Sequence, residues 1–127
     1  MTYDFLDGAG EVPAHQHSNG GGWVADSAYV VASAFVGPDA KVYGNAWLFD
    51  NASVFSNAEV YGAAQVYGNA MVCGNARVYD NAWVFGNAVV YGNAKVFGNA
   101  VVCDDAWIFG NAEVYGPPPG SMNSIGE

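Results

Sequence analysis

Histidine is the side chain best suited to acid–base chemistry or metal binding near neutral pH. This chain has two of them, His15 and His17. On an extended segment, residues two apart point to the same side, so the pair could supply two metal ligands or a general base for acyl transfer. A solvated N-terminal arm carrying two polar rings is the simpler interpretation and the one we favour. The sequence therefore predicts no catalytic residue, no cofactor and no bound metal, with His15 and His17 as the only candidates for chemistry.

The glycine, asparagine and aspartate residues that could also bind a ligand are better interpreted as turn residues. Gly20, Gly21 and Gly22 are not followed by the Lys and Ser/Thr of a phosphate-binding loop. Asn and Asp recur singly along the chain, without the clustered carboxylates of a repeat-type calcium site. Their frequency at turns is explained by their tolerance of positive φ.

Charge and hydropathy exclude several classes of partner. The chain has 12 acidic and 3 basic residues and a formal net charge of −9, which opposes binding to nucleic acid or to an anionic membrane. Apolar runs are interrupted every six residues, so no segment is expected to insert into a membrane. The acidic first residues do not resemble a secretory signal, and we expect synthesis in the cytoplasm.

One six-residue pattern dominates the chain and must position everything else. Its aliphatic residue stands at Val24 and at every sixth position up to Val114, giving sixteen units. A period of six with a turn pair in each unit does not suit an amphipathic helix. Each unit instead predicts a four-residue strand in which Ala88 and Val90 face one way and Val89 and Tyr91 the other, followed by a Gly-Asn turn in which both residues tolerate positive φ.

Two architectures could use this unit. A meander of short hairpins would leave its whole Ala/Val face in water. A solenoid with three units in each eighteen-residue coil encloses that face, and a narrow prism explains why the second inward position is Ala in every unit from Ala28 to Ala112. The sequence therefore predicts an all-β parallel solenoid of about five coils.

Sorting the units by eighteen assigns the outward residues to three faces. The first face carries the charges of the regular units, at Lys41, Glu59, Arg77, Lys95 and Glu113, and neighbours of opposite sign there should attract. The other two faces are apolar outside as well as inside, which is typical of an interface. Cys73 and Cys103 lie on different faces, so no disulfide is expected between them. The predicted protomer interface comprises Trp47, Phe49, Tyr67, Trp83 and Phe85 on the second face and Phe55, Met71, Tyr91, Trp107 and Phe109 on the third.

The pattern V-Y-G-N-A-x, at Val42–Trp47 and Val90–Lys95, resembles the hexapeptide repeat of the bacterial transferase hexapeptide superfamily. The resemblance implies a left-handed parallel β-helix and a homotrimer with parallel axes. Acyltransferases of that superfamily use a histidine near a cleft between protomers and loops that interrupt the repeat, whereas residues 23–116 contain neither. The repeat also lacks the histidines of the zinc-dependent carbonic anhydrases of this fold and the threonine ranks of ice-binding β-helices.

The ends of the chain depart from the repeat. We expect residues 1–22 to form an irregular capping arm, residues 23–116 the hexapeptide β-helix, and residues 117–127 a Pro-rich stop followed by a flexible tail. The opening at residues 11–28 resembles small hexapeptide proteins of bacterial and phage genomes.

The sequence leaves three functions open. The first is a non-enzymatic structural or adhesive trimer, such as a component of a phage virion or surface assembly. The second is an acyltransferase with its site at a protomer interface near His15 and His17. The third is a carbohydrate-binding module whose outward Tyr and Trp columns stack on sugar rings.

Overall fold

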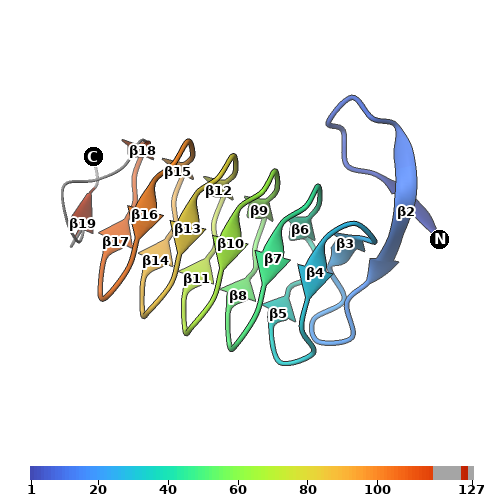
Figure 1. Ribbon diagram of the computed structural model, residues 1–127, viewed down its shortest axis with the longest axis horizontal. Helices are drawn as coiled ribbons and strands as arrows, with labels where there is room; N and C mark the ends of the chain where they lie inside the picture. Colours follow the sequence, from blue (N-terminus) through green and yellow to red (C-terminus); the bar gives the residue numbers. More distant parts are fainter. Residues whose placement is uncertain (116–123, 126–127) are drawn as a thin grey trace.

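The computed structural model describes residues 1–115 and the backbone of residues 124–125, and its regular structure is all β. Three parallel sheets form the walls of a solenoid (Figure 1). The first wall contains β3 (Trp23–Ala25), β6 (Lys41–Val42), β9 (Glu59–Val60), β12 (Arg77–Val78), β15 (Lys95–Val96) and β18 (Glu113–Val114). The second contains β4 (Tyr29–Val30), β7 (Trp47–Leu48), β10 (Gln65–Val66), β13 (Trp83–Val84) and β16 (Val101–Val102). The third contains β5 (Phe35–Val36), β8 (Ser53–Val54), β11 (Met71–Val72), β14 (Val89–Val90) and β17 (Trp107–Ile108).

The chain visits the three walls in turn and returns to the same wall one coil later. Lys41 pairs with Glu59 and Gln65 with Trp83, each eighteen residues apart. The predicted all-β parallel solenoid of about five coils is therefore confirmed. The left-handed sense of coiling stays a prediction. No helix of the described residues is long and apolar enough to cross a bilayer.

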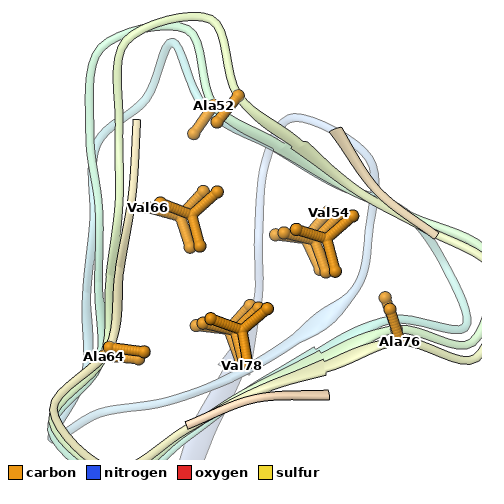
Figure 2. Close-up of a cluster of buried hydrophobic side chains, with 14 of the residues drawn as sticks. Ala52, Val54, Ala64, Val66, Ala76 and Val78 are labelled. Atoms are coloured by element: carbon orange, nitrogen blue, oxygen red, sulfur yellow. The ribbon is translucent and has the colours of Figure 1, made fainter. Parts of the chain in front are cut away.

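The interior is filled by the two inward columns of the repeat. Val54, Val66 and Val78 converge from the three walls, while the alanines lie nearer the corners (Figure 2). Nearly all of these Val and Ala side chains are fully buried. The exceptions are Ala28 and Val30 in the first coil, which stay partly exposed. Only a methyl group fits where two walls meet, which is why the corner position is restricted to Ala.

The corners differ in one respect from the turn that the sequence predicts. Positive φ is confined to the Gly position, for example +67° at Gly44, and none of the described Asn residues adopts it. Several Asn side chains instead bond to the equivalent residue of the next coil, as in Asn75 Nδ2 to Asn93 Oδ1 at 3.3 Å. The Asn residues therefore form hydrogen-bonded ladders along the corners.

The N-terminal arm is regular, where the sequence suggested irregular chain. Strands β1 (Thr2–Asp4) and β2 (Glu11–Gln16) form an antiparallel hairpin, and β2 pairs antiparallel with β3. Residues 19–22 lie against β5, because Gly22 N–H donates to the Val36 carbonyl and Val36 N–H to the Asn19 carbonyl. An edge strand has unpaired amide and carbonyl groups, and backbone pairing satisfies them better than a disordered cover would.

The C-terminal tail is described only at Ser124–Ile125, which forms β19 beside β17. This pairing differs from the flexible tail that composition predicts. It extends the third wall beyond the last repeat of the sequence. The predicted stop at Pro117, Pro118 and Pro119 lies outside the described residues.

Candidate functional surfaces

The two histidines have separate partners rather than a common ligand. His15 leaves β2 toward solvent, and its Nδ1 lies 2.7 Å from Oδ1 of Asp26, with both side chains about half exposed (52% and 54%). His17 is buried, and its Nε2–H donates to the Ala34 carbonyl at 2.7 Å. In residues 1–115, no three His, Cys, Asp or Glu side chains are grouped so as to hold a metal ion.

The role of His17 is one that sequence reasoning missed. Its ring reaches from the arm to the first coil, and its backbone N–H donates to the Gly22 carbonyl at 2.8 Å. Asn19 Nδ2 donates to the same Ala34 carbonyl at 3.2 Å. His17 therefore holds the arm against the solenoid. Nothing in its sequence context distinguishes a buried histidine from a solvated one.

The charged column of the first wall is in the predicted register, but its side chains do not form ion pairs with one another among the described residues. Lys41 pairs with Glu59, and Glu59 pairs with Arg77. Among the described residues, however, the sole ion pair is that of His15 with Asp26. The Tyr43 hydroxyl donates to Glu59 Oε1 at 2.7 Å, and Lys41 Nζ lies 5.6 Å from the centre of the Tyr3 ring. These contacts engage Glu59 and Lys41 in place of an ion pair between the two.

Aromatic rings stack along the solenoid in ladders. The longest ladder stands at one edge of the first wall and is continued by Phe5 of the arm. The centres of neighbouring rings in it are 4.8–5.4 Å apart. Its members are Phe5, Tyr43, Tyr61, Tyr79, Phe97 and Tyr115. Shorter ladders join Phe49 to Tyr67 and Phe85, and Tyr91 to Phe109. The inner rings of the longer ladders have a neighbouring ring on both faces, whereas an end ring such as Tyr115, which is 68% exposed, stacks on one neighbour only.

Burial in these ladders changes the acidity of their tyrosines. The pKa of Tyr43 is raised far above its usual value, chiefly by burial and then by its hydrogen bond to Glu59. Burial also raises the pKa of Tyr61 and Tyr79. The pKa of the Cys73 thiol is raised by burial as well, so this cysteine is a poor nucleophile. No disulfide joins Cys73 to Cys103.

The ten residues of the predicted interface divide into two groups. Four have large exposed fractions and stand on the second and third walls: Trp47 (48%), Met71 (37%), Trp83 (45%) and Trp107 (53%). The other six are half-buried: Phe49, Phe55, Tyr67, Phe85, Tyr91 and Phe109. Five of those six are in the ring ladders. The most exposed side chains of this set are therefore Met71 and the three outward tryptophans, and the interface itself stays a prediction.

A shallow groove lies beside Trp83, one of the two exposed tryptophans of the second wall. Its volume is about 460 Å³, and its lining consists of Ala63, Gln65, Asn81, Trp83, Asn99 and Val101. An exposed indole beside amide side chains can contact either a second protein surface or a sugar ring.

Comparison with known proteins supports the repeat. A family model described as the YdcK beta solenoid repeat matches residues 64–78, 72–85 and 76–92. No curated protein and no solved structure matches the chain. The matched residues lie in the middle of the solenoid and support a β-solenoid repeat protein; the match contains nothing that refers to a transferase.

Proposed function

We propose that this β-solenoid protein is a non-enzymatic structural or adhesive component that assembles as a homotrimer with parallel axes. The observation that carries the proposal is the distribution of exposed side chains over the walls. Trp47 and Trp83 project from the second wall and Trp107 from the third, whereas the first wall carries the basic residues. Large exposed indoles are typical of the centre of protein interfaces.

The second and third walls, or the corner between them, would then face inward in the trimer. The first wall would face outward with its charged column. A left-handed coil and a trimer are both implied by the resemblance to hexapeptide proteins. The opening at residues 11–28, which resembles small hexapeptide proteins of bacterial and phage genomes, supports incorporation into a virion or another external assembly.

The trimer is tested with Trp83→Glu, which places a charge in the proposed interface. Tyr115→Glu is the matched control, because Tyr115 is also an exposed aromatic residue (68%) but belongs to the ladder of the first wall. We expect sedimentation analysis to give a trimer for the wild type and for Tyr115→Glu, and a monomer for Trp83→Glu. A wild-type monomer would contradict the trimer, and a Trp83→Glu trimer would contradict the assignment of its interface.

A second candidate, acyl transfer, is favoured by the contact of His15 with Asp26. A carboxylate that orients an exposed imidazole is the arrangement that a general base requires. Acyl transfer from an acyl-CoA that is lost in His15→Ala and retained in His17→Gln would support this activity. Absence of acyl-CoA binding would leave the structural proposal in place.

A third candidate, carbohydrate binding, is favoured only by the groove beside Trp83. The inner rings of the ladders, such as Tyr61 and Tyr67, cannot stack on sugar rings, because both of their faces already contact neighbouring rings. A glycan array with the wild type and Trp83→Ala tests this function. Glycan binding that survives the substitution would exclude this groove as the binding site.

A further inference from the structure

Two of the chain's few basic residues, Arg77 and Lys95, are neighbours on the first wall. The protein has only 3 basic residues. Arg77 and Lys95 are paired in parallel register on β12 and β15, and this pairing places their backbones about 4.8 Å apart. Like charges directly opposite each other on a sheet face repel. A solenoid with a net charge of −9 nevertheless concentrates positive charge at this point.

The acidic residues that flank this pair in the column are not in ion-pair contact with it. Among the described residues, neither Arg77 nor Lys95 forms an ion pair. Glu59, the register neighbour of Arg77, instead accepts the Tyr43 hydroxyl at 2.7 Å. Both cationic side chains therefore keep hydrogen-bond donors available for a ligand.

The pair borders a polar groove of about 440 Å³. Its lining consists of Asn57, Glu59, Asn75, Arg77, Asn93 and Lys95. Asn75 Nδ2 donates to Asn93 Oδ1 at 3.3 Å, and Asn93 Nδ2 donates to Asn111 Oδ1 at 3.4 Å. Each Nδ2 carries two hydrogens, so each amide keeps a second donor beside the cations.

The charges at either end of the pair limit the size of the ligand. Glu59 precedes Arg77 in the column and Glu113 follows Lys95. A polyanion lying along the wall would meet these carboxylates. A single oxyanion group fits between them, because two cations and two amides match the donors that a carboxylate, phosphate or sulfate accepts.

We propose that Arg77 and Lys95, together with Asn75 and Asn93, form a binding site for one oxyanion group. Lys41 is the third basic residue of the chain, and its contact with the Tyr3 ring places it outside this site. Arg77 and Lys95 are on the first wall, and Asn75 and Asn93 are at the corner between this wall and the third. None of the four is among the ten predicted interface residues, so the proposed site does not depend on the trimer.

The site is tested by titrating the full chain, uniformly labelled with ¹⁵N, with sodium acetate, phosphate or sulfate. Sodium chloride keeps the ionic strength constant. We expect a saturable shift of the Arg77 Nε–H signal with at least one of the three anions. The anion that saturates at the lowest concentration identifies the preferred group.

Three variants separate a specific site from general attraction of anions. We expect Arg77→Gln and Lys95→Gln each to weaken binding by about tenfold or more, which is the usual effect of losing a charge-assisted hydrogen bond. In Arg77→Gln, binding is followed by the side-chain amide signals of Asn75 and Asn93, because the Arg77 signal is absent. Lys41→Gln removes the same charge from the same wall and should leave binding unchanged. Shifts that grow linearly with all three anions, or an equal loss in Lys41→Gln, would overturn the proposal.

Discussion

At the scale of single residues, aspartate replaces glycine at several corners of the solenoid. Asp50 and Asp80 have φ values of +56° and +59°, a conformation that costs most residues about 1–2 kcal/mol. Their carboxylates accept backbone N–H groups of the next coil, from Gly68 and Gly98, at 3.1 Å. This hydrogen bond offsets part of the backbone cost, and it explains why Asp occurs here and Ala does not.

Substitution of Gly74 tests this explanation. Gly74 has φ +66°, and a Cβ there would lie 2.9 Å from the backbone nitrogen of Gly92. We expect Gly74→Ala to lower the free energy of unfolding by about 1–2 kcal/mol or more. Gly74→Asp should cost less, because its carboxylate can accept the Gly92 N–H. Chemical denaturation measures both values, and an equal or larger loss for Gly74→Asp would contradict the compensating hydrogen bond.

The raised pKa of Tyr43 predicts how stability depends on pH. In the unfolded chain this hydroxyl should titrate near its ordinary value of 10.0, whereas in the folded protein it stays protonated to higher pH. The contribution of the protonated Tyr43 hydroxyl to the stability of the fold is therefore complete below pH 10.0 and is lost as pH rises above that value. Tyr43→Phe should lower the free energy of unfolding by about 1 kcal/mol at neutral pH, because the hydrogen bond to Glu59 is missing. At alkaline pH, the variant should lose less stability than the wild type.

Denaturation of Tyr43→Phe and the wild type across this pH range provides the measurement. Tyr115→Phe is the control, because Tyr115 is mostly exposed. An identical alkaline loss in the wild type and Tyr43→Phe would show that Tyr43 is not responsible.

At the scale of elements, the N-terminal hairpin continues both the first sheet and its aromatic ladder. β2 adds a strand beside β3, while Phe5 stacks on Tyr43 and Tyr3 stacks on Trp23. Phe5 is almost completely buried, although it belongs to the chain outside the repeat. The hairpin therefore covers an edge that would otherwise be open to strand pairing with other molecules.

Phe5→Ala should detach this hairpin. Loss of a buried aromatic side chain costs about 3–5 kcal/mol, more than a short hairpin can replace by other contacts. We expect faster amide exchange in β2 and β3 and faster proteolysis of residues 7–10. The neighbouring Leu6→Ala should have little effect, since Leu6 is 81% exposed. Unchanged exchange in Phe5→Ala would show that backbone pairing alone holds the arm.

At the scale of the whole molecule, the protein is a linear stack in which each coil contacts the coils before and after it. Equivalent residues repeat every eighteen positions in the hydrogen bonds, ring stacks and buried columns. The stability of such a stack is approximately a sum of coil terms and neighbour terms. A whole coil is therefore a unit that can be removed.

Deletion of residues 64–81 should give a shorter folded solenoid. The deletion joins Ala63 to Ala82, keeps the hexapeptide register and brings Glu59 beside Lys95 on the first wall. We expect a lower free energy of unfolding and a denaturant m-value reduced by roughly a fifth, because less surface is exposed on unfolding. Circular dichroism during denaturation measures both. Loss of the cooperative transition would contradict this independence of the coils.

The sequence by itself determined the coil, its walls and the residues on each wall. This was possible because every contact between repeats has the same sequence separation, so the columns of Val, Ala and Lys/Glu/Arg can be assigned by counting. The predicted neighbours Lys41 and Glu59 are indeed paired in register. Their lack of an ion pair was not predictable, because Tyr43 competes for Glu59 through a side-chain orientation that counting does not describe.

Only the tertiary structure decided the contacts of the arm and the exposure of the outward rings. Phe5, His15 and His17 lie outside the repeat, so no constant separation relates them to Tyr43, Asp26 and Ala34. The rotamers of the outward rings decide which of them are covered by stacking, and these depend on the coils above and below. Thus four of the ten residues predicted at the interface have large exposed fractions and six are half-buried, while Arg77 and Lys95 form no ion pair among the described residues.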